Sequence, residues 1–235
     1  MTPRKLALER LEGRALLAVY TVDFAGGYHP TLTSFHEALN AANATPEADV
    51  IEFAPSLAGS SITFDLIPNA STSVVYDLEI RGLGSDQLTF TPSQFADSLG
   101  FLVSPSVSHF TISGAMFAPR AAPNITKFAS IVRGSTGELR LEDVVATGLK
   151  HDALIAEAGS VTLVNTRLVA DTLSTSNGYG VRAWSGDVPV RLEGSEISGF
   201  KIGAIRATGD VTIVDSTISN NAGTSSVAAV YSMGG

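Results

Sequence analysis

The sequence contains no cysteine among its 235 residues, which excludes disulfide scaffolds, thiolate zinc sites and cysteine nucleophiles. It is also poor in basic residues: 15 Lys and Arg stand against 23 Asp and Glu, for a formal net charge of −8. Because phosphate contacts need clustered Lys and Arg, this balance argues against a nucleic-acid partner. No apolar run approaches the roughly 18 residues of a membrane-spanning helix, so no transmembrane segment is expected.

The composition that remains is that of a folded chain. Hydrophobic residues make up 44% of the sequence, too many for a disordered protein. The length suits one domain, which we divide into an N-terminal segment (1–19), a cap with the first strands (20–75) and a repetitive part (76–235).

The N-terminal segment differs from the rest in charge. Residues 1–19 carry four basic and two acidic side chains, whereas the remaining chain is strongly acidic. The run LERLEGRALLA at 8–18 resembles the N-terminal element of large exported proteins of some environmental bacteria. That resemblance implies a secreted or cell-surface protein. An amphipathic N-terminal helix of a cytosolic protein is the alternative, because the apolar stretch is short for a secretory signal.

One short amphipathic helix is expected within residues 33–43. Ser34 followed by Glu37 fits a capping box, in which hydroxyl and carboxylate each satisfy a free backbone amide. Apolar residues then follow at helical spacing on one face: Phe35, Ala38, Leu39 and Ala42. We interpret this helix as a structural cover for the end of a core.

Five octets repeat in the second half of the chain: FTISGAMF (110–117), LRLEDVVA (139–146), VTLVNTRL (161–168), VRLEGSEI (190–197) and VTIVDSTI (211–218). The first, third and eighth places are apolar. The fifth place is always Gly, Asp or Asn, the residue types that best tolerate a left-handed backbone. The sixth place is small in four copies. This pattern predicts a strand, a tight bend and a second strand.

A looser strand precedes each octet from the second onward, at 130–132, 154–156, 180–182 and 204–206, and each is followed by a Gly-containing turn. The resulting coil of 21–22 residues is expanded twice by about seven. Such a coil buries its inward face only by stacking on the next one, so we predict an all-β, parallel β-helix solenoid. Two other folds are less consistent with the sequence. A leucine-rich repeat would show a characteristic leucine spacing and an Asn ladder, and both are missing. A β-sandwich would not repeat the same bend about every 22 residues.

Three segments support a family resemblance: ALNAAN (38–43), ADVIEFAPSLAGSSITF (48–64) and LEIRGLGSDQLTF (78–90). They resemble the start of bacterial right-handed parallel β-helix repeat proteins, although Phe35-His36 replaces the usual Leu-Arg and a frequent preceding Cys is absent. The resemblance implies a right-handed coil, an N-terminal cap that includes the helix, and export to the surface or medium. It implies no single activity, since adhesins, surface-layer components and carbohydrate-active enzymes share this fold.

No catalytic constellation is recognisable, and no metal site or cofactor is expected. Asp143 and Asp215 occupy the bend place, which favours a turn role. Glu142 and Glu193 share the fourth place of octets two coils apart, too far separated for a carboxylate pair.

The two expansions, at 118–129 and 169–179, leave the same edge of the predicted solenoid. Loops on one edge of a rigid scaffold often carry binding residues, so the expansions indicate a binding surface. The alternative is that they are insertions without a function, because loops tolerate added residues at little cost. Trp184 could extend such a surface as a sugar-stacking or cation-holding ring, or could fill a packing gap. The candidate ligand-binding residues are Arg120, Lys127, Asn177, Tyr179, Arg182 and Trp184.

At the C-terminal end, residues 227–231 read as the start of another coil, and no amphipathic capping segment follows. We therefore expect either a longer chain or a partner that pairs with this edge. The function expected from the sequence is an exported, non-catalytic surface or adhesion module that binds an extracellular polysaccharide or another surface partner. A polysaccharide lyase or glycosidase, and a purely structural spacer, are the alternatives.

Overall fold

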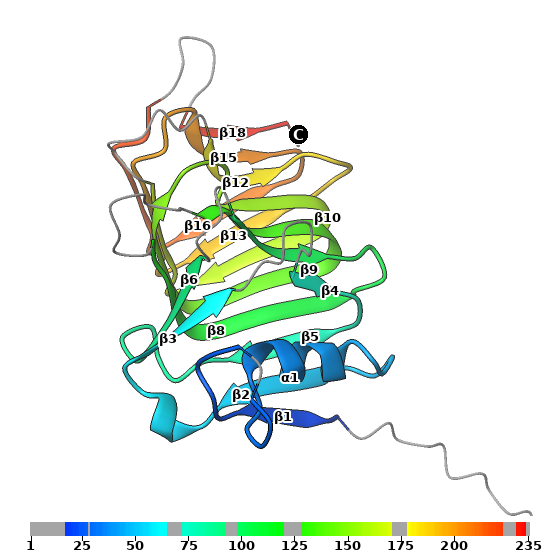
Figure 1. Cartoon of the computed structure of the whole chain (residues 1–235). Helices are drawn as coiled ribbons and strands as arrows, with labels where there is room; N and C mark the ends of the chain where they lie inside the picture. Colours follow the sequence, from blue (N-terminus) through cyan, green and yellow to red (C-terminus); the bar gives the residue numbers. More distant parts are fainter. Residues whose placement is uncertain are drawn as a thin grey trace, which may run out of the picture.

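The computed structural model describes residues 17–27, 29–64, 72–92, 98–119, 128–170, 178–222 and 229–233. The chain winds as a parallel β-helix in which each strand pairs in parallel with the strand one coil away. Figure 1 shows these coils stacked in chain order, with the helix and the first strands at one end and β18 at the other. The fold predicted from the repeat is thus confirmed, and the five octets lie directly on one another.

Three sheets form the walls, and the long strands β8, β9 and β10 bend through corners and belong to more than one of them. The first sheet contains β1 (Val19–Val22), β2 (Asp49–Phe53), β5 (Leu78–Arg81), β8 (His109–Phe117), β9 (Phe128–Leu149), β10 (Leu154–Val164), β13 (Val190–Glu193) and β16 (Val211–Val214). The second contains β3 (Ser60–Phe64), β6 (Leu88–Pro92), the ends of β8 and β9, β11 (Arg167–Ala170), β14 (Glu196–Ser198) and β17 (Thr217–Ser219). The third contains β4 (Thr72–Val74), β7 (Ser98–Val103), the starts of β9 and β10, β12 (Tyr179–Ala183), β15 (Gly203–Ala207) and β18 (Val230–Ser232).

The corner between the first and second sheets is made by the fifth place of each octet. The residues there are Gly114, Asp143, Asn165, Gly194 and Asp215, and all five have φ between 46° and 57°. This is the left-handed region, which glycine, asparagine and aspartate enter at the lowest cost. The bend predicted from residue type is therefore confirmed in every copy.

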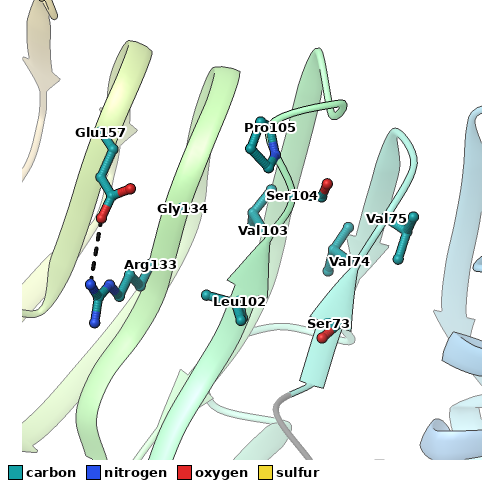
Figure 2. Close-up of a pocket in the computed structure, with 10 residues that line it drawn as sticks. All are labelled: Ser73, Val74, Val75, Leu102, Val103, Ser104, Pro105, Arg133, Gly134 and Glu157. Carbon is teal, nitrogen blue, oxygen red and sulfur yellow. Dashed lines mark ion pairs between the residues drawn. The ribbon is translucent and has the colours of Figure 1, made fainter. Parts of the chain in front are cut away.

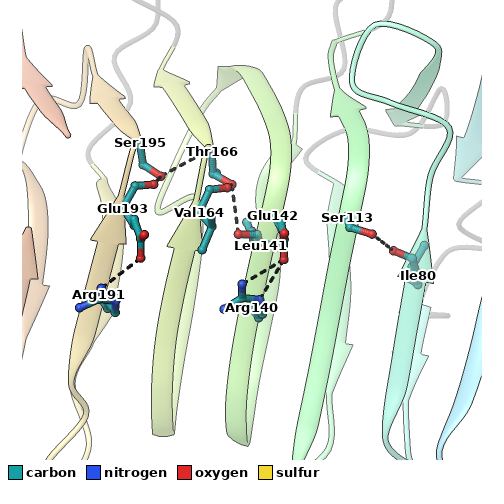
Figure 3. Close-up of polar contacts among 10 residues, drawn as sticks. All are labelled: Ile80, Ser113, Arg140, Leu141, Glu142, Val164, Thr166, Arg191, Glu193 and Ser195. Carbon is teal, nitrogen blue, oxygen red and sulfur yellow. Dashed lines mark hydrogen bonds and ion pairs between the residues drawn. The ribbon is translucent and has the colours of Figure 1, made fainter. Parts of the chain in front are cut away.

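Hydroxyl groups at the sixth place tie successive corners together. Ser195 Oγ accepts a hydrogen bond from the backbone amide of Thr166 at 3.0 Å, and Ser216 Oγ accepts one from the amide of Ser195 at 3.0 Å (Figure 3 shows the first). Both serine hydroxyls also donate to a carbonyl in their own coil. The small sixth residue thus satisfies an amide that the bend leaves without a strand partner.

Helix α1 (Phe35–Ala42) covers the N-terminal end of the core, as the sequence predicts. Ser34 and Glu37 form the capping box, and the four apolar residues of its predicted face are buried. The Phe35 ring lies 5.4 Å from that of Phe90 and 6.2 Å from that of Phe101, measured between centroids. Phe35 therefore extends the interior of the solenoid into the helix. None of the helices among the described residues is long and apolar enough to span a membrane.

Candidate binding face

The outward residues of the third sheet form one column that runs along the axis of the solenoid. Strand registers place each of them opposite the next, because parallel strands stack in register. The column contains Ser73, Leu102, Arg133, Ile155, Arg182, Arg206 and Tyr231. We call this surface the third-sheet face; it brings three arginines and several large apolar side chains into line.

Arg182 and Trp184, two residues apart on the same side of the chain, form a clamp on this face. The Arg182 guanidinium lies 4.0 Å from the centre of the Trp184 ring, which is cation–π geometry. Its Nη1 also lies 3.1 Å from Oδ2 of Asp152, in the preceding coil. Asp152 Oδ1 accepts a hydrogen bond from the Tyr179 amide at 2.7 Å. Asp152 is buried, so the arginine is held by a rigid anchor.

The clamp leaves the indole available to solvent. Trp184 is 45% exposed, so the alternative that it fills a packing gap is wrong, and the cation it holds is Arg182. An indole fixed in place with an open face presents an apolar, planar surface at low entropic cost.

A groove of about 630 Å³ lies along the N-terminal half of the third-sheet face (Figure 2). Its walls come from the ends of β4 and β7 and from the adjoining parts of β9 and β10. Leu102 and Pro105 supply apolar surface, whereas Arg133 and Glu157 form an ion pair at 3.6 Å on one side. The positive charge of Arg133 is therefore compensated within the groove.

Arg206 differs from the two other arginines of the column. Within the part of the chain that the structure describes, no carboxylate forms an ion pair with it. Its neighbours in the column are Arg182 on one side and Tyr231, which is 39% exposed, on the other. This end of the face thus combines an uncompensated cation with two exposed aromatic rings.

The first sheet presents a different outer surface. Arg140 pairs with Glu142 at 3.0 Å, and Arg191 pairs with Glu193 at 3.0 Å, in each case two residues apart on one strand (Figure 3). Charge is therefore neutralised strand by strand there, and the third-sheet face is the better candidate for recognition.

No protein-family model matches the sequence, and no curated protein matches it. Among solved structures, the crystal structure of pectate lyase Pel9A is similar, with a TM-score of 0.46 and 15% sequence identity. The match covers 87% of this chain and 64% of that chain, so it spans less than two thirds of the pectate lyase. At this identity the likeness concerns the course of the backbone alone.

The candidate residues named from the sequence have different places. Arg120, Lys127 and Asn177 lie outside the described residues. Tyr179 is 5% exposed, so its ring is part of the interior rather than of the open face. Arg182 and Trp184 are brought together as described.

Sequence reasoning missed Asp152, Arg206 and Tyr231. Asp152 pairs with Arg182, 30 residues away, and a single sequence carries no signal for a contact at that separation. A signal for Arg206 did exist, because Val181-Arg182 and Ile205-Arg206 occupy the same place in their coils. Among the described residues, no group of three or more His, Asp or Glu side chains could hold a metal ion.

Proposed function

We propose that the chain is an exported, non-catalytic surface or adhesion module that binds an extracellular glycan on the third-sheet face. The observation that carries the proposal is the exposed Trp184 ring, which packs on Arg182, a member of the column of outward side chains along the axis. Ligand sites commonly combine aromatic surface with a few well-placed polar groups, and this face has both. A rigid sheet also presents them without ordering a loop on binding.

The role of the acidic groups on this face supports a binding function. Asp152 is engaged by Arg182 and by the Tyr179 amide, and Glu157 is engaged by Arg133. Both carboxylates therefore hold basic side chains in place. A general acid or base would instead need to reach the reacting group of a substrate.

The test is a panel of polysaccharides, comprising alginate, hyaluronan and dextran, in which binding, new reducing ends and unsaturated products are measured in parallel. Saturable binding without product formation supports the proposal. Product formation would overturn it in favour of a lyase or glycosidase. Absence of both binding and turnover would overturn it in favour of a structural spacer.

The Trp184→Ala variant links the activity to the face. We expect it to lose most of the affinity while retaining the unfolding midpoint, because the ring is largely solvent-exposed. The matched control is His109→Ala, which removes an exposed ring from β8 on the first sheet. Equal loss in both variants would contradict the assignment of binding to the third-sheet face.

A further inference from the structure

We infer that Arg206 is the anion-binding residue of the third-sheet face and that its ligand is a carboxylated polysaccharide whose chain runs along the solenoid axis. This inference rests on the proposed function, and it adds the chemical class of the ligand and the residue that selects it.

The charges of the column distinguish its three arginines. Arg133 lies 3.6 Å from Glu157 and Arg182 lies 3.1 Å from Asp152, whereas Arg206 forms no ion pair within the described part of the chain. A guanidinium without a protein carboxylate retains its planar fork of donors for a ligand. Such a fork binds a carboxylate through two parallel hydrogen bonds, which gives both affinity and direction.

Asp152 also keeps the guanidinium of Arg182 away from that of Arg206. Arg182 and Arg206 are opposite each other in adjacent strands, about 4.8 Å apart along the axis. Two like charges at such a distance would repel each other. Asp152 lies in the coil on the other side of Arg182 and holds its guanidinium there. Asp152 and Arg182 are therefore positioning residues, and Arg206 is left to contact the ligand.

Aromatic rings flank Arg206 along the direction of the proposed ligand. Trp184 lies on the preceding coil, and Tyr231 lies opposite Arg206 on the following one. Sugar rings have apolar faces that pack on aromatic side chains, while their carboxylates require a cation. A chain laid across the strands would pass the pair of Arg182 and Trp184, then Arg206 and then Tyr231.

The net charge of −8 determines the salt concentration at which binding should be measured. An acidic protein repels a polyanion at long range, but in about 0.15 M salt the screening length is roughly 8 Å. Remote carboxylates then contribute little, and the contact at Arg206 dominates. Binding is therefore measured at this salt concentration.

Trp184 is the only tryptophan of the chain, so its fluorescence reports on this site alone. We expect alginate to change the emission saturably. The propylene-glycol ester of alginate, which keeps the backbone but not the charge, should bind at least about tenfold more weakly. Arg206→Gln should weaken alginate binding about tenfold, and Arg206→Lys should have a smaller effect. The control Arg191→Gln, on the first sheet, should bind as the unmodified protein does.

The outcomes separate this inference from the proposed function. Unchanged alginate affinity in a folded Arg206→Gln variant, or equal binding of alginate and its ester, would overturn the inference while glycan binding stands. If the unmodified protein binds no polysaccharide of the panel, the proposed function and the inference both fall. Thermal unfolding of each variant shows that it is folded before affinity is compared.

Discussion

Asp152 in one coil holds the guanidinium of Arg182 in the next coil, with Oδ2 and Nη1 3.1 Å apart. The same carboxylate makes a second contact, because its Oδ1 accepts a hydrogen bond from the Tyr179 backbone amide. One nearly buried carboxylate thus joins two coils and orients the clamp on the outer face. The geometry of the third-sheet face and the stability of the stack therefore depend on the same residue.

Removing this carboxylate is expected to destabilise the protein. Asp152→Ala leaves a partly buried guanidinium and an amide without partners, and should lower the free energy of unfolding by about 2–3 kcal/mol. Asp152→Asn keeps an acceptor for the amide and should cost about 1–2 kcal/mol. Urea unfolding followed by circular dichroism measures both. The control Glu193→Gln alters an exposed pair and should change stability by less than about 1 kcal/mol. Equal effects of Asp152→Ala and Glu193→Gln would contradict the anchoring role.

The serine hydroxyls that join successive corners, at the sixth place of the octets, are expected to contribute to stability. Ser195→Ala removes the acceptor of the buried Thr166 amide and should destabilise the protein by about 1–3 kcal/mol. Ser113→Ala is the matched control, because its hydroxyl makes only a long 3.4 Å contact with the Ile80 carbonyl (Figure 3). Its loss should cost less than about 0.5 kcal/mol. Thermal unfolding measures the stability of both variants. Similar losses of stability would show that the corner hydroxyls contribute little.

The bend residues are expected to respond to backbone chemistry rather than to side-chain size. Asn165 has φ 46°, so Asn165→Ala should destabilise the protein by about 1–2 kcal/mol, whereas Asn165→Gly should cost less. Gly194 occupies the same place in the next coil, which shows that glycine fits there. The order of the two unfolding midpoints is the measurement. An alanine variant as stable as the glycine variant would contradict the strain argument.

Removal of the Phe35 ring is expected to destabilise the cap end of the solenoid more than the rest. Phe35→Ala removes a buried ring from the cap and should cost about 3–5 kcal/mol locally. Because each coil of a solenoid contacts only its neighbours, amide hydrogen exchange should accelerate in β1 and β2 more than in β13 and β16. His36→Ala, next to it on the helix, serves as the control. Uniform acceleration along the whole stack would contradict a local cap.

The capping box predicts an acid-dependent stability. Hydrogen bonds from the backbone and then the side chain of Ser34 lower the pKa of Glu37 below its ordinary value of 4.5. A lowered pKa in the folded state means that this stabilisation is present above pH 4.5 and is lost as the pH falls through the folded value. Glu37→Gln should therefore flatten the fall of the melting temperature between about pH 5 and pH 3. Parallel pH profiles of the two proteins would argue against the capping interaction.

Most of the fold could be predicted from the sequence, because its rules are local and repeated. A left-handed bend needs Gly, Asn or Asp, a capping box needs Ser34 and Glu37 three residues apart, and alternation of apolar residues marks the inward side of each strand. These requirements act within a few residues and leave a visible pattern.

The candidate site was decided by the tertiary structure. Arg182 and Trp184 are near each other in sequence, but the residue that orients them, Asp152, is 30 positions from Arg182. The column of outward side chains exists only because parallel strands stack in one register, and the length of each connection sets that register. Local chemistry determined how each coil turns; the stacking of coils determined which charges meet and which arginine remains without a partner among the described residues.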